Sequence, residues 1–144
     1  LVTPADPVSF AGQPPSSRAP SFMLVLQGVW PDRAALSPGE VSARADEYWE
    51  YVTELVDEGV LVAAGDLRFD GGRRLGEGPV RLLDASEIGS PNHLVGILTL
   101  RVDTYEQALQ IGRRSPHLRY GGSVTVREVG LGFVAVPGMD DWAG

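Results

Sequence analysis

The feature that most constrains the fold of this chain is a pair of strand-length segments that are apolar on both faces. "FMLVL" (22–26) is apolar at every position, and both alternating sets of side chains in "HLVGILTLRV" (93–102) contain large apolar residues. Successive side chains of a strand point to opposite faces of its sheet, so both faces of this sheet need a cover. Any fold of this chain must therefore shield two apolar surfaces.

Helix and strand signals follow one another in an order that indicates an α+β fold. Ser37 with Glu40 forms a capping-box pattern that marks the start of one helix, and the start of a second is marked by Thr104 with Gln107 or by Asp103 with Glu106. The expected main elements are strands at 22–29, 60–67, 93–102 and 123–129, and helices at 37–59 and 104–114. The remaining segments are expected as short strands at 79–84 and 131–136 and as loops at 69–78 and 85–92. This order predicts a ferredoxin-like βαββαβ plait.

The predicted sheet has one face that its own helices do not reach. Two helices cover only one face of a four-stranded sheet, while the strands are apolar on both. A second copy of the same sheet is the simplest cover for the other face. The sequence therefore predicts a homodimer with its sheets face to face, which is a dimeric α/β barrel.

The two ends of the chain differ in composition from its centre. Residues 1–21 contain five prolines and little apolar periodicity, which predicts an extended N-terminal arm. We expect Val8 and Phe10 to hold this arm against the body or a neighbouring chain. The predicted organisation is thus an arm at 1–21, one domain at 22–136 and a C-terminal tail at 137–144.

Composition excludes several classes of function. Without cysteine there are no disulfides or thiolate nucleophiles, and without lysine there is no side-chain Schiff base. A net charge of -7 argues against a nucleic-acid partner. The chain also lacks a long apolar run, a signal-peptide pattern and the glycine motifs of nucleotide sites, so we expect a cytoplasmic protein with no membrane partner and no cofactor.

Residues 22–129 resemble a known family in the order and spacing of three motifs. These are "FMLVLQG", "YWEYVTELVDEGVLVAAGDL" and, most specifically, "VDTYEQALQIGRRSPHLRYGGSVTVR". Together they are similar to the YCII-related (DGPF-type) domain of the dimeric α/β-barrel superfamily. The resemblance implies a sheet-to-sheet dimer and places lyases, isomerases and cofactor-independent monooxygenases among the relatives.

The chain departs from this family at the positions expected to carry chemistry. The Asp-Gly-Pro-Phe loop falls on "DASE" (84–87), where only Asp84 is kept. The histidine that one branch carries on its first helix is replaced by Tyr48, and Asp32 is the nearest match to that branch's acidic residue. The His–Asp pair of that branch is therefore broken here.

The two histidines are candidates for acid–base chemistry. His117 follows a helix end, where it is either a proton-transfer group or a loop residue stabilised by the helix dipole; we favour the loop role. His93 shares its strand parity with Ile97 and Thr99, so it lies at the mouth of the dimer cavity or simply ends the strand. Two histidines without a third ligand make a poor metal site, so we expect no metal.

Five further residues are candidates for the site. Asp84 in an apolar pocket would have a raised pKa and act as a general base; otherwise it ends a strand and caps a turn. Tyr48 packs in the core or contacts ligand, and Asp32 is a turn residue or lies at the rim of the site. Arg81 and Arg101 either hold an anionic ligand or supply surface charge.

Two hypotheses of function follow. The first is a cofactor-free enzyme that performs acid–base chemistry on a small organic molecule in a cavity of the dimer, with Asp84 and a histidine as the acting groups. The second is a small-molecule-binding or assembly domain of the same fold without catalysis, which the broken His–Asp pair favours.

Overall fold

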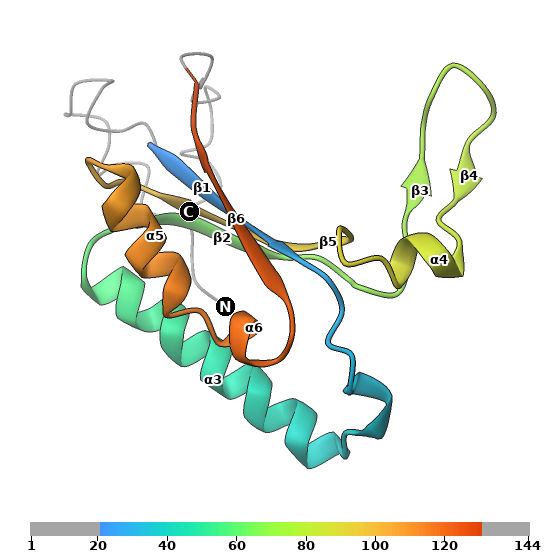
Figure 1. The fold of residues 1–144 in the computed structure, drawn as a ribbon, viewed down its shortest axis with the longest axis horizontal. Coiled ribbons are helices and arrows are strands. Elements are labelled where there is room, and N and C mark those ends of the chain that lie inside the picture. Colours follow the sequence, from blue (N-terminus) through green and yellow to red (C-terminus); the bar gives the residue numbers. More distant parts are fainter. Residues whose placement is uncertain (1–20, 131–144) are drawn as a thin grey trace, which may run out of the picture.

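The computed structural model describes residues 21–130, which form a four-stranded sheet with its two long helices on one face (Figure 1). The strands of this sheet are β1 (Phe22–Gln27), β2 (Leu61–Asp66), β5 (Leu94–Leu100) and β6 (Ser123–Glu128). The helices are α3 (Pro38–Asp57), α4 (Ala85–Ile88), α5 (Tyr105–Arg113) and α6 (Pro116–Arg119), with a 3-10 turn η1 (Arg33–Ala35). The predicted N-terminal arm before Ser21, the strand at 131–136 and the C-terminal tail lie outside the described residues.

The strand order of the sheet is β2-β5-β1-β6, and every neighbouring pair is antiparallel. Helix α3 connects β1 to β2, and α5 connects β5 to β6, each time passing over one intervening strand. This arrangement is compatible with the predicted ferredoxin-like plait, and the α+β class is confirmed.

Both long helices begin where their capping boxes predict. Ser37 accepts a hydrogen bond from the backbone N–H of Glu40, whose side chain caps Ser37 in return. Thr104 and Gln107 do the same for α5. The core between helices and sheet is formed by Phe22, Leu24, Leu26, Tyr51, Val52, Leu55, Leu98, Leu100, Ala108 and Ile111.

Between β2 and β5 the chain leaves the body of the protein. Strands β3 (Arg73–Arg74) and β4 (Arg81–Leu82) pair with each other, and together with α4 they form a projecting hairpin, residues 73–88 (Figure 1). The short strand expected near residues 79–84 is thus present. The loop expected at 85–92 is wrong in part, because α4 occupies its first residues.

A β-bulge in β5 changes which side chains share a face. Leu26 pairs with Gly96 and Gln27 pairs with Leu94, so Val95 has no partner on β1. Because cross-strand partners point to the same face, the alternation shifts at Val95. The prediction that His93 shares a face with Ile97 and Thr99 is therefore wrong.

The face of the sheet opposite the helices is apolar along its centre. Met23, Val25 and Ile97 lie there and are half-buried, while the pairs Val25–Thr125 and Met23–Arg127 bring polar side chains from β6 beside them. This face is therefore less uniformly apolar than the sequence predicts.

Candidate functional site

A cavity of about 380 Å³ lies on the helix side of the sheet, between α3 and the ends of β1 and β2. Its wall combines aliphatic and charged side chains with five aromatic ones, which are Trp30, Tyr48, Trp49, Phe69 and Tyr120. The cavity is partly open to solvent, and mostly apolar clefts of this size with a few polar groups are typical sites for small organic molecules. The ionisable groups in this wall therefore decide what the cavity can do.

Asp66 is the carboxylate that β2 delivers to this cavity. It pairs in register with Gly96, which pairs with Leu26 of the buried face, so its side chain points to the helix side. Its carboxylate accepts no hydrogen bond and forms no ion pair within residues 21–130. Asp66 is exposed to solvent, but the neighbouring cavity wall desolvates it in part and so raises the pKa of its carboxyl, although the nearby Arg33 charge opposes this rise. Sequence analysis missed this residue, although it is the acidic end of the apolar run "VLVAAGD".

Arg33 is half-buried in the wall of the cavity, where the charges of Asp66 and Asp70 act on it without forming an ion pair with it. Its guanidinium lies 3.7 Å from the centre of the Phe69 ring and 5.8 Å from that of Trp30. Among residues 21–130 it forms no ion pair, whereas Arg68 of the same cavity pairs with Asp70 at 3.1 Å. The cavity therefore presents one positive charge that the described part of the chain leaves unpaired.

Arg44 is held by a carboxylate instead. It makes two hydrogen bonds to Asp32, of 3.0 and 2.7 Å, and lies 4.0 Å from the Tyr120 ring centre. The hydrogen bond from Arg44 lowers the pKa of Asp32. Asp32, predicted as a turn residue or part of the rim, thus lies beside the cavity and orients one of its arginines.

His117 is buried, with only 4% of its surface exposed, and both of its ring nitrogens are engaged. Because a carbonyl only accepts, Nε2–H donates to the Gln27 carbonyl at 2.7 Å. Because an indole N–H only donates, Nδ1 accepts from Trp30 Nε1 at 3.2 Å. The ring is therefore neutral, and burial lowers its pKa. His117 positions Trp30 in the cavity wall and has no nitrogen left for proton transfer.

The glycine pair after His117 is explained by packing. A Cβ on Gly122 would lie 2.0 Å from His117 Nε2, so only glycine leaves room for the ring. Gly121 has φ +94, and a Cβ there would lie 2.8 Å from Cδ of Pro31. "HLRYGG" therefore builds the wall of the cavity, and its short helix α6 was not predicted from the sequence.

Tyr48 is half-buried in the cavity wall. Burial raises its pKa to about 12, and the Asp66 carboxylate adds to this rise. Its hydroxyl therefore stays protonated near neutral pH and is able to donate a hydrogen bond. This position agrees with the predicted contact to ligand as well as with a packing role.

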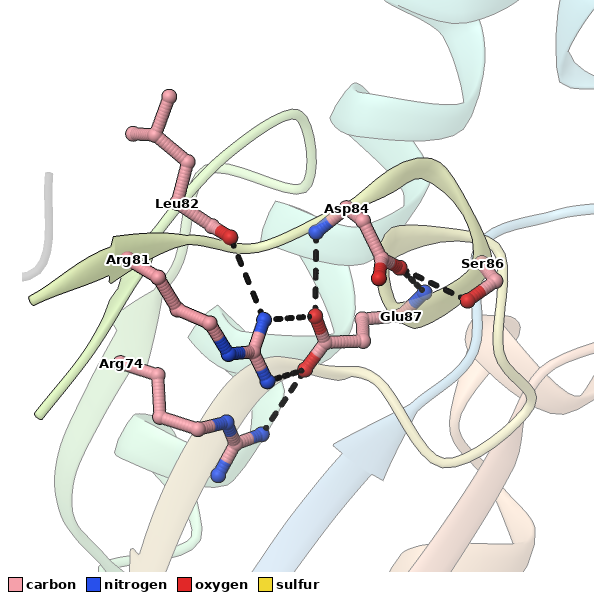
Figure 2. Close-up of polar contacts among 6 residues, drawn as sticks. All are labelled: Arg74, Arg81, Leu82, Asp84, Ser86 and Glu87. Atoms are coloured by element: carbon pink, nitrogen blue, oxygen red, sulfur yellow. Dashed lines mark hydrogen bonds and ion pairs between the residues drawn. The ribbon is translucent and has the colours of Figure 1, made fainter. Parts of the chain in front are cut away.

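Asp84 lies in the projecting hairpin, away from the cavity (Figure 2). Its carboxylate accepts from the Glu87 backbone N–H at 2.9 Å and from the Ser86 hydroxyl at 2.7 Å, and these bonds lower its pKa. Glu87 in turn accepts from Arg81 at 2.5 and 3.0 Å and from Arg74 at 3.3 Å. Of the two roles considered for Asp84, the structure shows the capping of a turn, here the start of α4, and contradicts the apolar pocket with a raised pKa. Of the two considered for Arg81, it shows an exposed charge, which pairs with Glu87.

The remaining predicted residues lie outside the cavity. His93 donates from Nε2 to the Phe69 carbonyl at 3.0 Å and lines a second, wider hollow under the projecting hairpin. Two charged residues of that hollow, Arg74 and Glu87, pair with each other. Arg101 follows β5, where its backbone N–H bonds to the Val60 carbonyl at 2.8 Å.

Comparisons with known proteins found no family model and no curated protein that matches this chain. The interpretation of the site therefore depends on its own chemistry. Within residues 21–130, no three histidine, aspartate or glutamate side chains are grouped so as to hold a metal ion. No helix of that range is long and apolar enough to cross a membrane.

Proposed function

We propose that the chain is a cofactor-free enzyme that transfers a proton on a small organic molecule bound in the aromatic cavity. The observation that carries the proposal is Asp66, a carboxylate that is open to solvent yet partly desolvated and has no hydrogen-bond partner in the described range, in a wall that also holds Tyr48 and Arg33. Desolvation makes a carboxylate a better base at neutral pH, and perturbed groups in cavities often do chemical work.

The chemistry that suits these groups is the removal of a proton from a carbon next to a carbonyl. Asp66 accepts this proton, and the electron pair of the broken C–H bond moves into the carbonyl to form an enolate. Tyr48, which keeps its proton, donates a hydrogen bond to the enolate oxygen. Asp66 then returns the proton to the same or another carbon, which gives exchange or isomerisation.

The proposal also includes a homodimer and a relationship to the YCII-related family. The apolar centre of the open face, formed by Met23, Val25 and Ile97, supports the packing of a second copy against it. The plait-like topology is compatible with the YCII-related family. The cavity, however, lies on the helix side of the sheet, so the ligand is bound within one subunit and not between two open faces.

The alternative, binding without conversion, is favoured by one observation. Both nitrogens of His117 are occupied, so Asp66 has no histidine beside it in the cavity as a second acid–base group. A binding domain predicts a ligand that is retained unchanged.

The test is hydrogen–deuterium exchange at the CH₂ group of phenylpyruvate and of phenylacetone, followed by proton NMR in D₂O. We expect Asp66→Asn to slow the catalysed exchange by about 100-fold or more. The matched control Asp84→Asn should exchange at the wild-type rate, because asparagine also caps helices well. Equal rates for wild type and Asp66→Asn would refute the proposal, and binding without exchange would establish the alternative.

A further inference from the structure

We infer that the cavity selects organic anions, planar carboxylates above all, and that Arg33 is the residue that holds the carboxylate. This inference rests on the proposed function for its site, but it concerns the class of ligand and not the reaction. It follows from the charges of the wall, from the support of the Arg33 side chain and from the aromatic surroundings.

Of the three arginines that line the cavity, Arg33 is the one whose guanidinium forms no ion pair within residues 21–130. Arg44 donates two hydrogen bonds to the Asp32 carboxylate, and Arg68 forms an ion pair with Asp70. Arg33 has no ion pair within residues 21–130, and the charges of Asp66 and Asp70 act on it only from beyond ion-pair distance. Its half-buried guanidinium therefore gains from a counter-ion that reaches hydrogen-bonding distance. A bound carboxylate would supply that counter-ion.

The guanidinium of Arg33 is supported by an aromatic ring. The guanidinium carbon lies over the Phe69 ring, 3.7 Å from its centre, a distance that suits stacking of the two groups. The N–H groups lie in the plane of the guanidinium, so stacking leaves them available to a carboxylate in the geometry of two parallel hydrogen bonds. Phe69 also reduces the rotamer freedom that Arg33 would lose on binding, which favours affinity.

The rest of the wall suits a flat ligand body. Trp30, Tyr48 and Trp49 offer ring surfaces, and the hydrogen bond from Trp30 to His117 holds the Trp30 ring in place. A ring or a conjugated chain stacks on such surfaces, and a volume of about 380 Å³ accommodates a single-ring ligand.

The test compares benzoate with benzamide, which has the same shape without the charge. Binding is measured by calorimetry and by the shift of the Trp30 indole N–H signal. We expect wild type to bind benzoate roughly tenfold or more tightly than benzamide, as charge-assisted hydrogen bonds predict. Arg33→Gln should abolish this preference, and Arg33→Lys should keep only part of it, since lysine has the charge but not the fork.

Arg113→Gln is the matched control, because Arg113 is an exposed arginine on α5 that pairs with Glu106. It should bind both compounds as wild type does. A preference that survives in Arg33→Gln, equal binding of the two compounds, or no binding of benzoate to wild type would overturn the inference. Arg33-dependent benzoate binding without exchange on phenylpyruvate would refute only the proposed reaction. Asp66-dependent exchange that is as fast on phenylacetone as on phenylpyruvate would refute only the anion preference.

Discussion

The projecting hairpin and the aromatic cavity both contain aspartate and arginine, but they use them differently. In the hairpin, Asp84 caps α4, and Glu87 is shared by Arg81 and Arg74, so each of these four charged groups has a partner (Figure 2). In the cavity, the Asp66 carboxylate and the Arg33 guanidinium have no hydrogen-bond partner among the described residues. The comparison teaches that residue type alone does not mark a site; what distinguishes the cavity is that a carboxylate and a guanidinium without hydrogen-bond partners in residues 21–130 lie beside aromatic side chains.

The largest expected effect on stability comes from filling the space behind the cavity wall. In Gly122→Ala the new Cβ would meet the His117 ring, which two hydrogen bonds hold in place, so the wall must shift. We expect a loss of about 2–3 kcal/mol in the free energy of unfolding. Urea denaturation measures this value.

Gly71→Ala, beside the projecting hairpin, is the control, because nothing lies within 4 Å of the added Cβ. Its stability should stay within about 0.5 kcal/mol of wild type. A similar loss in both variants would show that the cavity wall is no more tightly packed than the hairpin.

A smaller effect is the pH dependence of stability, because His117 of the cavity wall and Glu87 of the hairpin titrate in different pH ranges. The pKa of His117 is lowered from its ordinary 6.5 in the folded state, so the unfolded chain binds more protons just below that pH. The stability that neutral His117 provides is therefore present above about pH 6.5 and is lost as the pH falls below it. The pKa of Glu87 is lowered to about 2, so its contribution is lost only as the pH falls from 4.5 towards 2.

Urea denaturation at about pH 7.5 and about pH 5.5 separates these windows. Wild type should be less stable at the lower pH, and His117→Gln should show a smaller difference between the two. An unchanged difference in His117→Gln would mean that His117 is not the titrating group.

Local signals were readable from the sequence, and contacts between distant segments were not. The capping boxes at Ser37 and Thr104 depend on residues three positions apart, and both helices begin there. The same pattern at Asp84 and Glu87 marks the start of α4. The resemblance to the family's signature loop instead placed Asp84 among the candidate catalytic residues.

The cavity depends on contacts that no local pattern contains. Trp30 meets His117 across 87 positions of the sequence, and the bulge at Val95 depends on how β5 pairs with β1. Asp66 could have been noticed as a carboxylate that ends an apolar strand. Its lack of a partner, which makes it a candidate, is visible only in the fold.

The most direct test of this account is the pKa of Asp66 beside that of Asp84, measured by the carboxyl carbon shifts in an NMR titration. We expect Asp66 to titrate above the ordinary aspartate value of 3.8 and Asp84 to titrate below it. Benzoate bound to Arg33 should raise the Asp66 value further, because it neutralises the nearby positive charge. An Asp66 pKa at or below that of Asp84, unmoved by benzoate, would contradict the assignment of the cavity as the working site.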